Sequence, residues 1–389
     1  MKSFVSAGSF LVLALLLVLS LAGCGGVSAN PRPTPSPTPT PPGATPTPTP
    51  AAAHGTFVYV SNASSATSTA QLTGYRLNAD GTLALLPNSP FTVNGFPSGT
   101  PAGNFLVTAS GNMVFTYAVD PASGALTLAG SAAVVGAGGI VTDSKNIYVS
   151  GNIPASNSTG IYGFAVSANG MLTSLAGSPY VFTQACDLCD VPFALALNNN
   201  FLIQGGVGFH GVGDFTVYPR GAGGVLGKAQ ILGTDAEESV TIQRPTGAIS
   251  YALNTDDFSL TEFTIGPSGT AAIGAQTFID TQPEDILIDN TGRFLLVLDL
   301  TGVVHVFSIN PGNGNFSQIG TSEAAGNGAG GIVMDPSGHF VFMTQGANPN
   351  FPGSVNQITV YTFDPATGAM KKLQIYPQPG SSGITVIAR

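Results

Sequence analysis

The sequence has little charge and no tryptophan, and its balance of charge is acidic. Only 8% of its 389 residues are charged, and the formal net charge is −9. A nucleic-acid-binding surface needs a stripe of Lys and Arg, of which the whole chain has 11, so we expect no nucleic-acid partner. Hydrophobic residues nevertheless make up 43% of the chain, which favours a packed core over disorder.

No apolar run is long enough to cross a membrane as a helix. The run at 10–21 (FLVLALLLVLSL) falls short of the roughly 20 residues that a spanning helix needs, and it fits the core of a signal peptide. It leads into LAGC at 21–24, which resembles a bacterial lipobox. The resemblance implies removal of 1–23 and acylation of Cys24, and Gly25 after it implies sorting to the outer membrane. An ordinary signal peptide with an incidental cysteine is the alternative.

The segment 24–53 is a linker rich in Pro and Thr. Residues 30–50 read NPRPTPSPTPTPPGATPTPTP, in which alternate residues lack an amide donor. Such a segment forms neither helix nor sheet, and it is expected to run as semi-rigid polyproline II. We predict a spacer that holds a domain at 54–389 away from the membrane, with Thr residues that could carry O-glycans.

Beyond the linker, short apolar strands alternate with turns rich in Gly, Pro, Asn and Asp. The clearest recurring unit is a Gly-containing turn followed by a strand; the glycine permits a positive φ, and Asp or Asn caps the turn. Seven copies occur, at 78–86 (NADGTLALL), 120–128 (DPASGALTL), 167–175 (SANGMLTSL), 219–227 (PRGAGGVLG), 266–274 (GPSGTAAIG), 310–318 (NPGNGNFSQ) and 364–372 (DPATGAMKK).

Two further strands precede each turn, and they set the period of the repeat. The first of them begins near Phe57, Phe105, Ile147, Phe201, Ile249, Phe294 and Phe340, which are 42 to 54 residues apart. A period of this length, with four short strands per unit and no helical periodicity, is typical of a β-propeller. The sequence therefore predicts an all-β fold of seven four-stranded blades.

The two ends of the repeat predict how the ring closes. Innermost strands are visible before later copies as GIVTD, FALAL, SVTIQ, DILID and GIVMD, whereas the first copy begins abruptly with GTFVYVSN. GITVIA at 383–388 is the missing strand, so we expect the C-terminal strand to complete blade one. Closure leaves no large sheet edge exposed, and we expect a monomer.

Two stretches carry a resemblance to a known family. YVSN…LTGYRLNADGTLALLPNSPF and IVMDPSGHFVFMTQG…ITVYTFDPATGAMKK resemble the lactonase-like seven-bladed propellers, which include bacterial 6-phosphogluconolactonases and surface proteins with YVTN-type repeats. The resemblance spans about residues 55–389 and implies the propeller fold. It also implies a lactonase activity, with sites formed by His, Arg and Glu on one face. Turn and strand motifs specify a fold better than an activity.

The order of the strands sorts the loops onto two ends of the ring. With strands lettered a to d from the axis outwards, the b–c loops and d–a connections share one end, here called the upper end, and the a–b and c–d turns share the lower end. Lys and Arg residues fall at the lower end or on strands c and d. Because phosphate is usually bound by Arg or Lys, a phosphorylated lactone is disfavoured.

Acidic residues instead gather in the loops of the upper end. Candidates for a general base there are His210, Glu238, Glu284 and Asp285, and candidates for holding a hard cation such as Ca²⁺ are Glu237, Asp256, Asp257 and Asp299. The alternative is that these are solvated loop carboxylates that keep a low-charge protein soluble. His305 lies within a strand, and we interpret it as a packed core histidine.

Cys186 and Cys189 form a CxxC in a predicted loop (CDLC). Structural zinc takes four ligands and a thioredoxin-like site needs a helix, so a local disulfide in an oxidising compartment is preferred. Idle thiols, a metal site and a redox site remain as alternatives.

Two functions follow from these patterns. The first is a lipid-anchored propeller of the cell envelope that acts as a binding module for an envelope protein or a glycan. The second is a lactonase-type hydrolase of an uncharged, non-phosphorylated sugar lactone.

Overall fold

The chain divides into two units, Met1–Ala51 and Ala52–Arg389, and the described residues belong to the second. The structure, a computed structural model, describes residues 55–389 except for 63–68, 98–100, 157, 182–188, 198–199, 209–213, 234–237, 244–247, 255–257, 267–268, 348–352 and 381–382. Within these residues no helix is long and apolar enough to cross a membrane.

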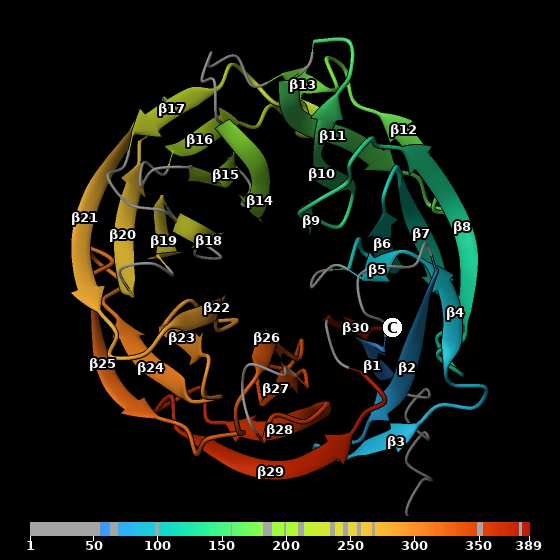
Figure 1. Ribbon diagram of the computed structural model, residues 1–389, viewed down its shortest axis with the longest axis vertical. Coiled ribbons are helices and arrows are strands. Elements are labelled where there is room, and N and C mark those ends of the chain that lie inside the picture. Colours follow the sequence, from blue (N-terminus) through green and yellow to red (C-terminus); the bar gives the residue numbers. More distant parts are fainter. Residues whose placement is uncertain are drawn as a thin grey trace, which may run out of the picture. The chain divides into compact units, whose positions relative to one another are not determined.

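Seven antiparallel sheets surround a common axis, as the repeat predicts (Figure 1). From the axis outwards, blade one is β30 (Ile384–Ala388), β1 (Thr56–Ser61), β2 (Thr69–Leu77) and β3 (Leu83–Leu85), with β4 (Phe91–Asn94) also pairing with β2. Blade two is β5 (Phe96–Pro97), β6 (Phe105–Ser110), β7 (Met113–Val119) and β8 (Leu126–Ala133). Blade three is β9 (Ile140–Thr142), β10 (Asn146–Ile153), β11 (Ser158–Val166) and β12 (Leu172–Ser174), with β13 (Tyr180–Val181) also on β11.

The remaining four blades each have four strands. Blade four is β14 (Cys189–Leu197), β15 (Phe201–Gly208), β16 (Asp214–Pro219) and β17 (Gln230–Gly233), with a 3₁₀ turn, η1 (Ala222–Gly224), between the last two. Blade five is β18 (Glu238–Gln243), β19 (Ile249–Asn254), β20 (Ser259–Ile265) and β21 (Ala271–Phe278). Blade six is β22 (Pro283–Ile288), β23 (Phe294–Asp299), β24 (Val304–Ile309) and β25 (Phe316–Thr321). Blade seven is β26 (Ala329–Met334), β27 (Phe340–Gln345), β28 (Gln357–Phe363) and β29 (Met370–Pro377).

The core lies between the blades. Each of seven clusters of buried apolar side chains joins one blade to the next, as Leu296 and Leu298 of blade six join Val341 and Met343 of blade seven. A middle strand therefore buries both of its faces, which explains why β23 reads as a continuous apolar run (FLLVLD) instead of alternating with polar residues.

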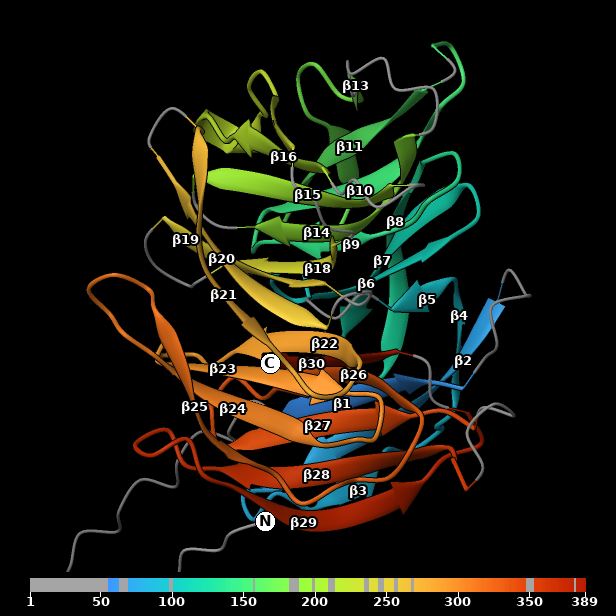
Figure 2. The ribbon, with the colours of Figure 1, turned by 60° about the vertical axis from the view of Figure 1, so that its left-hand side comes forward.

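The ring closes where the sequence predicts. Strand β30 pairs antiparallel with β1, with Val386 opposite Val58, and the backbone amide of Arg389 donates to the carbonyl of Gly55 over 2.9 Å. The C-terminal strand is thus the innermost strand of blade one. Figure 2 shows β30 beside β1 and close to β26 of blade seven.

Candidate functional site

The cations of the lower end hold the blades together. Arg293 donates to the carbonyls of Pro365 and Ala366 in the c–d turn of blade seven, over 3.3 and 3.2 Å. Lys372, on the outermost strand β29 of blade seven, donates to the carbonyl of Ala324 in the d–a connection from blade six, over 2.9 Å. Every Lys and Arg that the structure describes lies at the lower end or on adjoining parts of the strands, as predicted; Arg244 lies outside the described residues.

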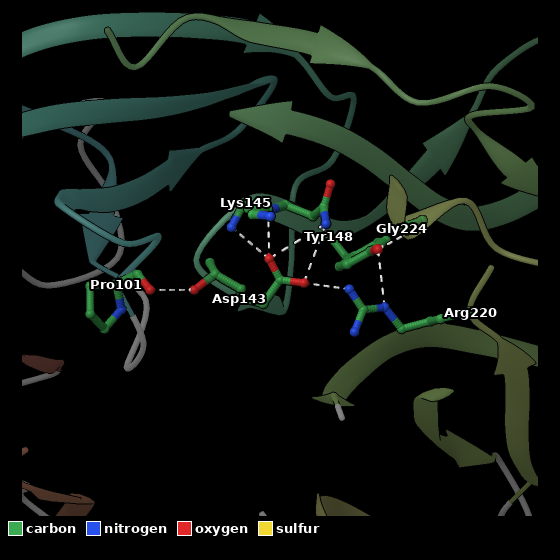
Figure 3. Close-up of polar contacts among 8 residues, drawn as sticks. Pro101, Asp143, Lys145, Tyr148, Arg220 and Gly224 are labelled. Atoms are coloured by element: carbon green, nitrogen blue, oxygen red, sulfur yellow. Dashed lines mark hydrogen bonds and ion pairs between the residues drawn. The ribbon is translucent and has the colours of Figure 1, made fainter. Parts of the chain in front are cut away.

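Arg220 makes the most extensive of these contacts (Figure 3). Its guanidinium pairs with the carboxylate of Asp143 on blade three and donates from Nε to the hydroxyl of Tyr148 over 3.2 Å. That hydroxyl donates to the carbonyl of Gly224 over 2.5 Å. Burial opposes ionisation of Asp143, but backbone donors at Lys145 and Asn146, with Arg220, hold its pKa below the usual value. The network joins blades three and four.

At the upper end, a β-bulge sets two acids at the start of the innermost strand of blade six. Pro283 pairs with Asp299 and Asp285 pairs with Leu298, so Glu284 is the extra residue in β22. A bulge redirects side chains locally, and bulges are common beside active sites. Glu284 and Asp285, both predicted as base candidates, are therefore neighbours at one point of the ring.

Asp285 reaches across to blade seven. Its Oδ2 accepts the backbone N–H of Ile332 over 2.9 Å, and its Oδ1 accepts the N–H of Ile286 over 2.8 Å. Strand β26, which carries Ile332, is paired on one side only, so its other edge faces the ring axis. The carboxyl group of Asp285 lies at that edge, and the residue as a whole is partly exposed.

The two acids have raised pKa values. Burial raises the pKa of Asp285 from 3.8 to about 6, against the opposing effect of its two backbone donors. Burial also raises the pKa of Glu284, and the negative charge of Asp285 adds to this. A carboxylate that gains a proton near pH 6 is suited to general-base catalysis near neutral pH.

Asp299, predicted as a cation ligand, forms hydrogen bonds with neighbouring groups of the protein. Its Oδ1 accepts from the backbone N–H groups of Thr301 and Val303 and from the Thr301 hydroxyl, over 2.7 to 3.0 Å. Its Oδ2 accepts from Thr281 Oγ1 over 2.6 Å and contacts His305 Nε2 at 2.9 Å. Burial opposes its ionisation, but the bonds from His305 and Thr281 hold its pKa well below the usual range. The geometry supports a structural role in the b–c turn.

His305 is largely buried, as expected of a core histidine, and both ring nitrogens have partners. Nε2 lies 2.9 Å from Asp299 Oδ2, and Nδ1 lies 3.2 Å from Gln318 Nε2. Because the carboxylate accepts and the amide nitrogen donates, we assign the proton of the neutral ring to Nε2. The pairing of Asp299 with His305 was not predicted from the sequence, although the five residues between them form one tight hairpin.

The other predicted residues are only partly described. His210, Glu237, Asp256 and Asp257 lie outside the described residues, as do Cys24 and Cys186. Glu238 begins β18 with its backbone opposite Asn254, and Cys189 begins β14 opposite Gly208. The disulfide, the lipid anchor and the cation site therefore stay predictions. Among the described residues, no three His, Cys, Asp or Glu side chains gather closely enough to hold a metal ion.

Two residues near Asp285 escaped the sequence analysis. Gly331 on β26 pairs with Thr344 on β27. Thr344 is fully buried, and its hydroxyl has no hydrogen-bond partner among the described residues. The repeat holds a signal that could have found the site: PEDILID at 283–289 aligns with AGGIVMD at 329–335, which places Gly331 where blade six has Asp285.

Comparison with known proteins gives the same fold. Residues 289–383 match the family model described as lactonase, 7-bladed beta-propeller. The structure resembles the periplasmic gluconolactonase PpgL of Pseudomonas aeruginosa, at 16% identity and a TM-score of 0.67, over 86% of this chain and 99% of that one. It also resembles putative 6-phosphogluconolactonases of Bacteroides uniformis (15%, TM-score 0.66) and Bacteroides fragilis (17%, TM-score 0.65), over 86% of this chain and 99% and 98% of theirs. No curated protein matches.

The family model covers only the last part of the ring, whereas the structural matches extend over nearly all of the propeller. At these identities, structural likeness shows the fold and leaves the activity to the site. The chain is a seven-bladed β-propeller, and the resemblance of its repeat to lactonase-like propellers is confirmed by the family-model match over 289–383 and by the structural neighbours.

Proposed function

We propose that the protein hydrolyses an uncharged sugar lactone in the bacterial cell envelope, with the carboxylate of Asp285 as general base. The observation that carries this proposal is the position of Asp285: its carboxyl group lies at the axis-facing edge of β26, bonded to the N–H of Ile332, with a pKa raised to about 6. Above pH 6 the group is ionised and can accept a proton from water.

The chemistry needs no other reactant than water. Asp285 takes a proton from a water molecule while the oxygen of that water bonds to the carbonyl carbon of the lactone. The tetrahedral intermediate then collapses with cleavage of the bond between that carbon and the ring oxygen, which takes up the proton. The product is the open-chain aldonic acid.

Two observations support a neutral substrate. No described Lys or Arg lies in the b–c loops or d–a connections of the upper end, and the ionised Asp285 would repel a phosphate. The similar PpgL is a gluconolactonase, and it is periplasmic. An extracytoplasmic location also agrees with the signal peptide, the lipidated Cys24 and the spacer proposed from the sequence.

Measuring acid release from D-glucono-1,5-lactone in a pH-stat, after subtracting spontaneous hydrolysis, tests the proposal. We expect kcat/KM to rise with pH through about 6 and then level off. Asp285→Asn should lower kcat by about 10²- to 10⁴-fold, the usual contribution of a general base. Asp280→Asn is the matched control, because Asp280 is exposed at the same end of blade six. Wild-type hydrolysis no faster than buffer at any pH from 5 to 7 would refute the activity.

A binding module for a neutral glycan is the second candidate. It is favoured by the two backbone donors that fix the Asp285 carboxylate, because a fixed acceptor suits a sugar hydroxyl as well as it suits water. A wild-type protein that binds a neutral sugar at this site without turnover would support this candidate over the hydrolase.

The membrane anchor is tested separately. Cys24→Ser should move the protein from the membrane fraction to the soluble periplasmic fraction. Retention of the variant in outer membranes would rule out acylation of Cys24 as the anchor.

A further inference from the structure

We propose that Asp285, Gly331 and Thr344 form a subsite for one hydroxyl group of a neutral polyol, and that Thr344 determines specificity for that hydroxyl. The inference rests on the proposed function in that it places the sugar of the lactone beside the proposed base. Its test is a binding measurement, which does not require hydrolysis.

The three residues border one space at the junction of blades six and seven. A Cβ added at Gly331 would lie 3.5 Å from Thr344 Oγ1 and 3.6 Å from Asp285 Oδ2. Both oxygens therefore face the position that a side chain of residue 331 would fill. Gly331 is partly exposed and Gly330 is exposed, so the strand edge beside the two oxygens meets solvent.

The hydroxyl of Thr344 gives the reason to expect a ligand there. The side chain is fully buried, yet no described group bonds to its Oγ1. A buried hydroxyl without a partner destabilises the fold, and valine at the same position would avoid this cost. A polar group that is kept at such a cost calls for a partner from outside the protein.

The two oxygens select the chemical class of that partner. Above its pKa Asp285 only accepts hydrogen bonds, whereas the hydroxyl of Thr344 can donate. A ligand hydroxyl satisfies both, because it donates to Asp285 while it accepts from Thr344. A carboxylate or phosphate would be repelled by Asp285 and has no proton to donate to it.

The glycine keeps this space open, and replacing it provides a sharp test. The backbone of Gly331 is outside the left-handed region, and the added methyl group would make ordinary van der Waals contacts. Gly331→Ala should therefore fold normally while placing a methyl group between the two oxygens. Gly320→Ala is the matched control, because a Cβ at Gly320 on the rim strand β25 meets nothing within 4 Å.

The probe is D-glucono-1,5-lactam, a lactam analogue that resists hydrolysis, with binding measured by calorimetry. We expect Thr344→Val to weaken binding about 10-fold, because it removes one hydrogen bond to the ligand. Gly331→Ala should weaken binding by a similar factor, because its methyl group keeps the ligand hydroxyl from the two oxygens. Gly320→Ala and Thr344→Ser should bind as the wild type does. Thr344→Val should also melt at the wild-type temperature or higher, because it removes an unpaired hydroxyl.

The outcomes separate the subsite from the activity. If the lactam binds as expected but no lactone is hydrolysed, the subsite stands and the hydrolase is refuted. If the lactone is hydrolysed but Thr344→Val and Gly331→Ala bind the lactam normally, the subsite is refuted and the hydrolase stands. If Thr344→Val melts at a lower temperature but binds the lactam normally, the partner of the Thr344 hydroxyl is a buried water molecule and the subsite is refuted. A wild-type protein that does not bind the lactam also refutes the subsite.

Discussion

At the scale of single residues, Asp285 combines a role in the site with a cost to the fold. The rise of its pKa to about 6 means that the folded protein disfavours the ionised form. After allowance for partial exposure, this penalty is on the order of 2 kcal/mol at neutral pH. Functional sites often carry such a cost, because a base must be ionised where the surroundings disfavour charge.

The pH dependence of stability tests this cost. Because the folded pKa lies above the unfolded value of 3.8, the penalty is absent below about pH 4 and is complete once the pH has risen through about 6. Asp285→Asn cannot ionise, so its melting temperature should exceed that of the wild type by a few degrees at pH 7 and by little at pH 4. Melting curves at the two pH values measure the effect, and a difference independent of pH would contradict it.

The sequence predicted at which end of the ring a residue lies, because that depends only on the order of the strands. Counting strands placed Glu284 and Asp285 at the upper end of blade six and the cations at the other end, and both placements hold. The contacts of Asp299 with His305, and those of Asp285 with Ile332, depend on how strands and blades approach in space. Spacing along the chain does not specify such contacts, which is why Gly331 and Thr344 were missed.

At the scale of strands and turns, the structure explains two regular features of the repeat: the glycine of the c–d turn and the aromatic residue that often begins strand b. The turn glycines of all seven copies have φ between 71° and 86°, as expected of residues chosen for the left-handed region. They also lie against the preceding blade: a Cβ at Gly368 would be 2.8 Å from the ring of Phe294, and one at Gly81 would be 2.3 Å from that of Phe340. In blades one, two, six and seven the aromatic start of strand b therefore packs on the turn glycine of the next blade.

Tyrosine hydroxyls reinforce the same junctions. Tyr59, Tyr148 and Tyr251 on strand b donate to the carbonyls of Gly124, Gly224 and Gly314 in the turn of the next blade, over 2.5 to 2.6 Å. These bonds are buried. Each turn is thus held by a side chain from its neighbour, and blades that share no backbone ladder remain in register.

Tyr251→Phe should lower the free energy of unfolding by about 1–2 kcal/mol, because the buried carbonyl of Gly314 loses its donor. Urea unfolding monitored by circular dichroism measures this loss. Tyr162→Phe is the control, since its bond to the carbonyl of Asn152 is exposed and stays within one hairpin. Equal effects of the two substitutions would show that the junction bond has no special weight.

Most strands were predictable, and the exceptions have a common cause. Blade two lacks a recognisable innermost strand in the sequence, and the structure shows only Phe96–Pro97 there. The outermost strand of blade three is likewise divided into β12 and β13 on the same partner. Two- and three-residue strands are too short for a hydrophobic pattern, so only their partners reveal them.

At the scale of the whole molecule, the pairing of β1 with β30 is the seam of the ring. Val58, Val60, Ile384 and Val386 lie in one buried cluster with Phe342 of blade seven. The seam therefore has a buried apolar cluster of its own, as every other junction between blades does. The closing strand was predictable because GITVIA at 383–388 resembles the innermost strands of the other blades and is not followed by the other three strands of a blade.

Val386→Asp tests whether the seam holds the ring. Val386 is 6% exposed, so the substitution buries a charge without a partner, and we expect a loss of more than about 4 kcal/mol or failure to fold. Ala388→Asp, on the exposed end of the same strand, should have little effect. If Val386→Asp melted within a few degrees of the wild type, closure would not be required for stability.

The seam also determines when the protein can finish folding. Its two strands lie more than 300 residues apart along the chain, so bringing them together costs about 5 kcal/mol of chain entropy before any contact repays it. β1 is synthesised, and in an exported protein also crosses the membrane, well before its partner, and at usual synthesis rates this interval lasts tens of seconds. During that interval one edge of β1 is unpaired and can pair with another copy of the chain, so crowded expression would favour aggregates over closed rings.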